Sequence, residues 1–316
     1  MPFHVSTSGT GAGEVVVLED DTDGIKAEIF TFGALLNSFS INLNGTEKNV
    51  IHGFQNPADA KENITPLFQS AKLSPFACRM KEGHYTFANQ KYKIEKFYNG
   101  REAIHGLIYD AVFTVKEKSV TADSAFVTLV YNYNKNDAGY PFFYCAEINY
   151  VLKRSGNLTI STKITNLSEI PIPVADGWHP YFCFGNKVDD LHLFMDTNKM
   201  VEFDGKLLPT GNTLPYQQFQ ELHPINDTDF DNCFIVNENT TQPACALRDL
   251  ESGLQLNVFV QKNYPYLQVF IPKTRNCIAL ENLSALPDSF NNAIGLTILE
   301  PSQSEEFITS YRLRKI

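Results

Sequence analysis

Cys145-Ala-Glu-Ile-Asn-Tyr-Val-Leu-Lys153 begins the stretch that decides the fold, and Arg154-Ser-Gly-Asn157 and Leu158-Thr-Ile-Ser-Thr-Lys-Ile164 follow it directly. The two outer parts alternate apolar and polar side chains, which is the period-2 pattern of a half-buried strand. The short polar segment between them contains a glycine and is typical of a hairpin turn. This stretch therefore predicts two neighbouring antiparallel strands.

The same pattern recurs on both sides of the hairpin, in segments rich in Val, Ile, Phe and Tyr. We expect strands at residues 14–19, 25–32, 36–43, 85–87, 92–97, 111–117, 125–133, 191–196, 199–203, 233–236, 254–260, 267–271, 277–280, 296–299 and 306–314. Only residues 57–73 favour a helix, which Pro66 interrupts. So many closely spaced strands predict an all-β protein, a large antiparallel β-sandwich.

Length and composition limit the alternatives. The chain has 316 residues and shows no linker or short repeat, so we expect a single domain over residues 1–316. Its net charge of -10 and pI near 5.2 disfavour a nucleic-acid partner or an anionic membrane surface. The six cysteines show no C-x-x-C pair, and the first residues lack a signal-peptide pattern. We expect a reduced, cytoplasmic protein, either a monomer or a homodimer.

The stretch from Pro171 to Gly185 is a candidate ligand site. It holds the only tryptophan, Trp178, directly before His179, and Pro180 favours an extended backbone at that histidine. Trp178 and Tyr181, with Phe182, offer flat apolar faces of the kind that stack on a sugar ring. The alternative is a buried edge strand with a structural histidine.

Four further polar residues lie where predicted strands end or loops begin. They are Arg79, His105, Asp231 and Glu281, and each alone could be a structural charge. Together with His179 they supply an acid–base pair, a second histidine, a carboxylate acceptor and an arginine donor. That set suits a neutral polyol with one reactive hemiacetal.

Metal chemistry has weak support in the sequence. None of the seven histidines forms an H-x-x-x-H or H-E-x-x-H pair, so we predict neither a metal site nor a cofactor. Asp227, Asp229 and Asp231, with Glu238 beyond them, imitate a calcium loop. Asn232 replaces its glycine and the flanking helices are missing, so a calcium ion there would be incidental.

Motifs in order along the chain resemble the aldose 1-epimerase (galactose mutarotase) family. They are Cys78-Arg79-Met80, Ile104-His105-Gly106, Gly139-Tyr140-Pro141, His179-Pro-Tyr-Phe182, Phe230-Asp231 with Phe234, and Glu281 with Pro287 and Asn291. The family resemblance implies its antiparallel β-sandwich and a small-molecule sugar substrate. Trp178-His179-Pro180 is more similar to an epimerase-like branch than to the galactose branch.

The resemblance also implies roles for the site residues. His179 would be the general acid and Glu281 the general base, while His105, Arg79 and Asp231 would hold and polarise the sugar. Ring opening at C1 needs a proton removed from the C1 hydroxyl and another delivered to the ring oxygen. We expect neighbouring carboxylates such as Asp231 to raise the pKa of His179, and hydrogen-bond donors or Arg79 to keep Glu281 ionised.

Three other functions remain open at this point. A hexose-6-phosphate epimerase would use Arg79, Lys81 or Arg101 to grip the phosphate. A non-catalytic carbohydrate-binding protein would keep the fold without turnover. A glycoside hydrolase or lyase would place two carboxylates across a cleft, for which Asp231 and Glu281 could serve. Glu300 also follows an apolar run, but its Pro301 turn context makes Glu281 the preferred base.

Overall fold

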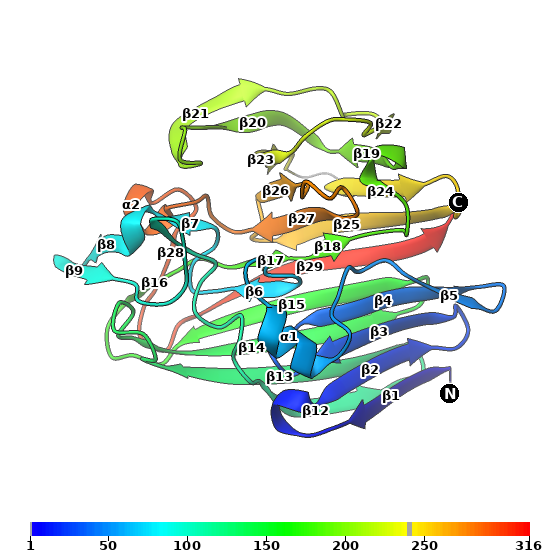
Figure 1. The fold of residues 1–316 in the computed structure, drawn as a ribbon. Coiled ribbons are helices and arrows are strands. Elements are labelled where there is room, and N and C mark those ends of the chain that lie inside the picture. Colours follow the sequence, from blue (N-terminus) through cyan, green and yellow to red (C-terminus); the bar gives the residue numbers. More distant parts are fainter. Residues whose placement is uncertain (1, 239–241) are drawn as a thin grey trace.

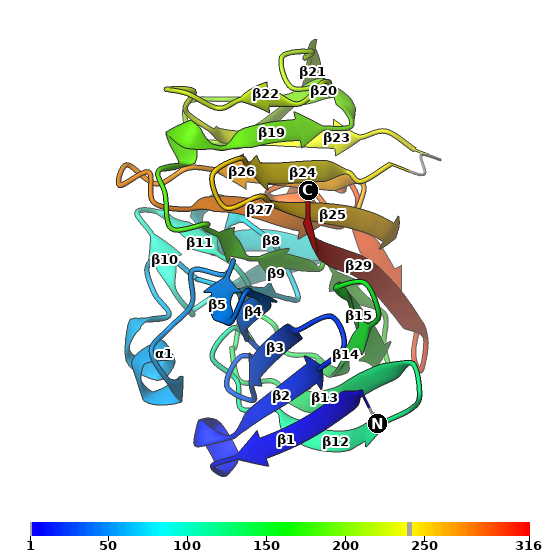
Figure 2. The same cartoon turned by 90° about the vertical axis from the view of Figure 1, so that its right-hand side faces the viewer.

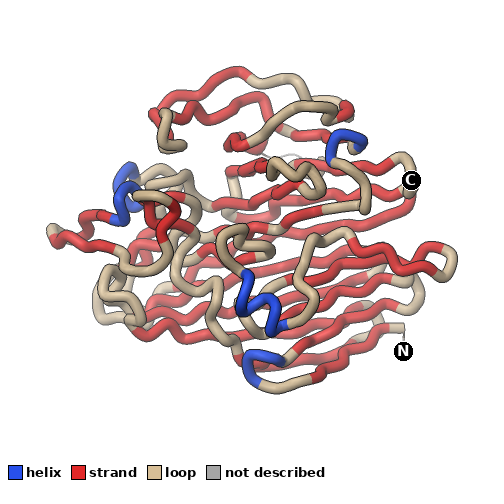
Figure 3. Tube along the Cα trace, in the orientation of Figure 1, coloured by secondary structure: helices blue, strands red, loops and turns tan. Residues whose placement is uncertain are grey.

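The computed structural model describes residues 2–238 and 242–316; Met1 and residues 239–241 of the predicted 1–316 domain lie outside the described residues. Antiparallel strands dominate the chain (Figures 1 and 3), and the predicted all-β sandwich is confirmed. Within the described ranges, no helix is long and apolar enough to cross a membrane.

The largest sheet contains the predicted hairpin. Its strand order is β12-β13-β14-β15-β29-β25-β24-β19-β22. These strands span Thr114–Val120, Ser124–Asn134, Phe143–Lys153, Asn157–Asn166, Ser304–Lys315, Leu254–Lys262, Cys245–Asp249, His192–Met195 and His223–Pro224, respectively. Lys153 pairs with Asn157 across the predicted turn, and alternate side chains of β14 are buried because one face of the sheet packs against the core.

Two further sheets lie over this one. The first is β1-β2-β3-β4-β5, spanning Phe3–Ser8, Val15–Asp20, Ile25–Phe30, Leu36–Leu43 and Thr46–Asn49. The second has the order β21-β20-β23-β26-β27-β17-β6, with β18 also paired to β27. In this order, its strands span Pro209–Pro215, Thr197–Phe203, Asp231–Val236, Tyr266–Phe270, Ile278–Leu283, Gly177–His179 and Ala71–Leu73, and β18 spans Tyr181–Phe182.

Short elements complete the chain. The three-stranded sheet is β10-β11-β7, spanning Tyr98–Asn99, Glu102–Ile104 and Arg79–Met80. Two pairs are β8 with β9, His84–Phe87 and Gln90–Lys93, and β16 with β28, Ile172–Val174 and Thr297–Leu299. Helix α2 is Ser289–Asn292, and three 3-10 turns span Gly11–Gly13, Lys81–Gly83 and Val188–Asp190.

The sandwich packs two sheets against one. Strands β1 and β2 contact β12, β13 and β14, as the two views in Figures 1 and 2 show. The eight-stranded sheet covers the other part of the same face, where the ring of Phe182 meets that of Tyr311 in β29. Thr309 of β29 also donates a 3.0 Å hydrogen bond to the side chain of Asn282 in β27. The eight-stranded sheet therefore has its back in the core and its front free for a site.

The predicted helix at residues 57–73 is wrong beyond its first half. Helix α1 spans only Pro57–Asn63, where the Asn56 side chain accepts hydrogen bonds from the first turn. It cannot run through Pro66, whose missing N–H and ring oppose a continuing helix. The apolar residues that follow instead form β6, in which Lys72 pairs with Trp178 of β17. Sheet pairing therefore overrides the helical pattern of this segment.

Candidate active site

His179 and Glu281 face each other across two neighbouring strands. Gly177 pairs with Leu283, and Tyr181 pairs with Ala279, so the same register sets His179 opposite Glu281. The His179 Nε2 atom lies 3.3 Å from Glu281 Oε1. Both residues are almost completely buried, at 5% and 2% exposure. Strand pairing thus brings together two residues that are distant in the sequence.

Trp178 does not lie at this site, and its predicted role in sugar stacking is wrong. Successive side chains of a strand point to opposite faces, so Trp178 points away from His179 into the core. There the Lys72 ammonium lies 4.3 Å from the indole centroid, and the ring of Tyr150 packs against its edge. Tyr181, two residues beyond His179, does line the site, with its ring centroid 4.9 Å from that of His179.

Arg79 and His105 enter the site from the small three-stranded sheet. Arg79 in β7 pairs with Ile104 in β11, and His105 follows directly with a positive φ of 64°. The backbone amide of His105 donates to the Cys78 carbonyl at 3.0 Å. Its ring centroid lies 4.9 Å from that of His179. The sharp backbone turn after β11 therefore aims the second histidine at the first.

Asp231 and Gln268 form the opposite side. Asp231 begins β23, and its carboxylate accepts a 3.0 Å hydrogen bond from Gln268 Nε2. Gln268 lies in β26 directly opposite Glu281 in β27. Gln268 was not among the predicted site residues; its only signal in the sequence is a polar residue inside the apolar strand Tyr266–Phe270. Each of the three central strands thus contributes one polar side chain.

These side chains line a single cavity of about 300 Å³. Its polar walls are Arg79, Asn99, His105, His179, Asp231, Gln268 and Glu281, and its apolar walls are Pro66, Leu67, Cys78, Ile104, Tyr181, Phe203, Leu207, Phe270 and Pro287. Six of the seven predicted site residues, all except Trp178, therefore meet at one cavity. A few polar groups among apolar walls are typical of small-molecule sites.

Several buried polar atoms at the cavity have no hydrogen-bond partner within the described part of the chain. They are Nδ1 of His105, Nδ1 of His179, Oε1 of Gln268 and Oε2 of Glu281. Buried polar atoms normally have partners, because leaving one unsatisfied costs about 1–3 kcal/mol. A ligand rich in hydroxyl groups could supply both donors and acceptors here.

Burial shifts the acid–base groups towards their neutral forms. Desolvation lowers the pKa of His179 to about 4. Desolvation, reinforced by the Asp231 charge, raises the pKa of Glu281 well above its usual range. For His105, burial first and the His179 and Arg79 charges second hold the pKa well below 6.5. These directions are opposite to the predicted increase in the pKa of His179 and to the predicted ionised Glu281, because desolvation is the largest cause of both shifts and the Asp231 charge adds to that of Glu281.

The cavity carries little positive charge. Among the described residues, Arg79 is the only lysine or arginine in its lining, opposite the carboxyl groups of Asp231 and Glu281. Arg101 is exposed and pairs with Glu82 at 3.1 Å, and Lys81 is not among the lining residues. Of the three cations that could grip a phosphate, Lys81 and Arg101 therefore lie outside the cavity lining.

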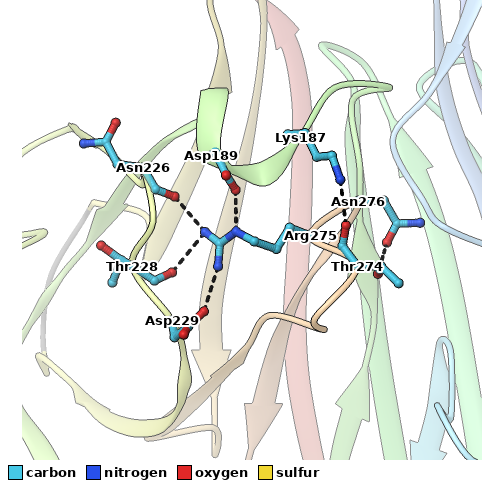
Figure 4. Close-up of polar contacts among 8 residues, drawn as sticks. All are labelled: Lys187, Asp189, Asn226, Thr228, Asp229, Thr274, Arg275 and Asn276. Atoms are coloured by element: carbon cyan, nitrogen blue, oxygen red, sulfur yellow. Dashed lines mark hydrogen bonds and ion pairs between the residues drawn. The ribbon is translucent and has the colours of Figure 1, made fainter.

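The calcium-like segment is tied to an arginine instead (Figure 4). The Arg275 guanidinium donates to the Asp229 carboxylate at 2.8 Å and to the Asn226 and Thr228 carbonyls at 2.7 and 3.2 Å. It also donates to Asp189 at 2.5 Å. Over the described ranges, no group of three or more His, Cys, Asp or Glu side chains has a metal-binding arrangement. The Arg275 guanidinium thus occupies three oxygens of this segment, those of Asn226, Thr228 and Asp229.

Comparison with known proteins identifies relatives by sequence, solved structures with a similar fold and a matching family model. The uncharacterized protein YihR of Escherichia coli K12 is 25% identical over 266 residues, which cover 81% of this chain and 83% of that protein. A galactose mutarotase-like protein from Clostridium acetobutylicum shares the fold with a TM-score of 0.87 at 16% identity, covering 100% and 99% of the two chains. The galactose 1-epimerase of Lactobacillus acidophilus NCFM gives 0.82 at 20% identity, covering 99% and 98%. The family model described as aldose 1-epimerase matches residues 14–312, and the chain belongs to this family.

Proposed function

We propose that the protein is an aldose 1-epimerase that interconverts the α and β anomers of a free, uncharged aldose. The observation that carries this proposal is the buried pair of His179 and Glu281, 3.3 Å apart in a cavity sized for a small molecule. A purely binding protein has no need of a matched acid and base. Arg79 is the one lysine or arginine that lines the cavity in the described part of the chain, and it accompanies two carboxyl groups, which favours a neutral sugar over a sugar phosphate.

Ring opening can be written with this pair alone. Glu281 takes the proton of the C1 hydroxyl, the C1 carbonyl forms, the C1–O5 bond breaks, and His179 gives its proton to O5. The open chain then rotates about C1–C2. Closure on the other face returns the O5 proton to His179 and the Glu281 proton to O1. Each positioned proton transfer contributes about 10²–10⁴-fold.

The neutral forms favoured by burial fit one stage of this cycle. The pair can hold one proton in two ways. Either His179 is charged and Glu281 is ionised, or His179 is neutral and Glu281 is protonated. The first distribution starts ring opening and the second follows it, so burial of the two side chains favours the charge state of the open-chain stage. Sugar hydroxyls and Arg79 would stabilise the ionised pair when the substrate binds.

The proposal is tested by anomer exchange on a panel of free aldoses, followed by NMR or polarimetry above the spontaneous rate. Glu281→Gln keeps the shape but cannot take the proton, so the rate should fall by roughly 10²-fold or more. Glu300→Gln is the matched control, because Glu300 is exposed outside the cavity, and it should stay within a few-fold of the parent.

Three results would contradict the proposal or its assignments. If no free aldose exchanges faster than the spontaneous rate although sugars bind, the carbohydrate-binding alternative stands. If Glu300→Gln is inactive and Glu281→Gln is not, the assignment of the base is wrong. Added inorganic phosphate should not compete, and strong competition would favour the sugar-phosphate alternative instead.

A further inference from the structure

Two cysteines continue the ladder that holds the acid–base pair. Tyr181 pairs with Ala279, and Phe182 with Ile278. One further step in this register places Cys183 opposite Cys277. The two thiols therefore lie four residue pairs beyond His179 and Glu281, an even number, and so on the same face of the same two strands.

Packing supports this placement. Cys277 belongs to a small buried cluster with Tyr181 and Ala279, and the side chain of Cys183 packs against that cluster. Both thiols are free. Cys277 is almost completely buried, whereas Cys183 is partly exposed, so an external reagent can reach the pair through Cys183.

The hydrogen bonds place the two cysteines at a favourable position in the ladder. The Leu280 amide donates to the Pro180 carbonyl, so these two residues form a hydrogen-bonded pair. Hydrogen-bonded and non-hydrogen-bonded pairs alternate in antiparallel sheets. Cys183 and Cys277 are thus a non-hydrogen-bonded pair, for which Cα atoms lie about 4.5 Å apart. Disulfides span Cα separations of about 4.4–6.8 Å.

We propose that Cys183 and Cys277 are a redox modification site that closes a disulfide between the two strands carrying the acid–base pair. With a small disulfide as the oxidant, the Cys183 thiolate attacks one of its sulfurs and releases the first thiolate. The Cys277 thiolate then attacks the mixed disulfide and releases the second. Each released thiolate takes up the proton lost by a cysteine, so two protein thiols become one disulfide and the reagent becomes two thiols.

The bond would close a long loop of the chain that contributes part of the cavity lining. The chain between Cys183 and Cys277 contains both Asp231 and Gln268, whereas His179 and Glu281 lie just outside it. Closing so long a loop restricts the unfolded chain, which should raise the melting temperature by about 5 °C or more. The native pairing of the strands already holds the two residues opposite each other, so little rearrangement is needed.

The rate of formation should depend steeply on pH. Burial raises the pKa of Cys183 to about 11 and, together with the charge of Cys183, that of Cys277 to about 12. Since the thiolate is the attacking species, its fraction grows about tenfold per pH unit below the pKa. Oxidation should therefore be about 100-fold faster at pH 9 than at pH 7.

The experiment exposes the folded protein to oxidised glutathione at pH 7, 8 and 9 and digests it without reduction. We expect one linked pair of peptides containing Cys183 and Cys277, the loss of two free thiols, a higher melting temperature, and reversal by dithiothreitol. Cys183→Ser and Cys277→Ser should each abolish the link and the thermal shift. Cys145→Ser is the matched control, a partly exposed cysteine on β14, and should leave both unchanged.

Two outcomes would overturn the site: no link between Cys183 and Cys277 at pH 9 while the protein stays folded, or a link that joins other cysteines, such as buried Cys78 and Cys233. Circular dichroism on the serine variants separates loss of the site from loss of the fold. None of these measurements uses sugar turnover, so the outcome is independent of the proposed epimerase activity.

Discussion

At the scale of single residues, we expect His179 and Glu281 to titrate as one coupled pair. Their side chains lie 3.3 Å apart, both are buried, and desolvation drives both towards neutrality. Coupled groups of this kind lose and gain protons as a pair. The form that holds one proton is the competent one under the proposed mechanism, whichever of the two residues carries it.

This coupling predicts an unusual pH profile. A second proton enters the pair only as the pH falls towards the lowered His179 pKa of about 4, and the shared proton leaves only above the raised pKa of Glu281. The value of kcat/KM for anomer exchange, corrected for the spontaneous reaction, should therefore stay nearly constant from pH 7 to pH 5.5 and decrease near pH 4. A tenfold loss between pH 7 and pH 5.5 would show that an ordinary histidine near ~6.5 controls the reaction.

The sequence indicated most of the cavity residues but could not show how they meet. His105, His179, Asp231 and Glu281 stood out as polar residues beside predicted strands, and the cavity joins them with Arg79. Trp178 was misplaced because the sequence does not tell which face of a short strand is buried. Gln268 was missed because a glutamine within an apolar strand carries no motif, and its position opposite Glu281 depends on register.

At the scale of elements, local sequence patterns predicted where strands lie better than they predicted which strands pair. The hairpin of β14 and β15 and the strand Leu36–Leu43 carry clear alternation and were predicted closely. Residues 71–73 were assigned to a helix because their pairing with β17, a strand far along the chain, leaves no local trace. Strands β1 and β24 were not predicted, although β1 pairs with β2 along its full length.

We predict that the turn after β11 requires a glycine at position 106. Gly106 has a φ of +76°, and a Cβ atom there would lie 2.3 Å from the Ser74 carbonyl oxygen. Gly106→Ala should therefore destabilise the fold by roughly 2 kcal/mol or more, through left-handed strain and a backbone clash, and should displace the preceding His105. Urea unfolding and anomer exchange measure the two effects.

Gly13→Ala is the control for this change. Gly13 has no positive φ, and a Cβ atom there would meet nothing within 4 Å. The urea unfolding midpoint of the Gly13→Ala variant should stay close to that of the parent protein. Equal stability of the Gly106 and Gly13 variants would mean that the close approach of Gly106 to Ser74 does not constrain the backbone.

At the scale of the whole molecule, a buried ion pair joins segments that are far apart in the chain. Lys72 in β6 pairs with Asp176, which directly precedes β17, and both side chains are fully buried. The Tyr264 hydroxyl donates to the same carboxylate at 2.6 Å, and the Asp176 amide donates to Ser284 Oγ at 2.8 Å. This network lies behind the strands that carry His179 and Glu281 and connects them to the core.

Substitutions at Lys72 and Asp176 can separate the cost of an unpaired buried charge from the net stabilisation that the ion pair provides. Lys72→Met leaves the buried Asp176 carboxylate without its cation, which should cost about 3–5 kcal/mol and lower the melting temperature by several degrees. Adding Asp176→Asn removes the remaining charge while keeping its shape, so the double variant should regain most of that stability. Lys116→Met is the control, because it breaks an exposed pair with Glu147 and should cost less than about 1 kcal/mol. If instead the double variant loses the sum of the two single losses, the two side chains stabilise the fold independently, and the ion pair does not connect these segments.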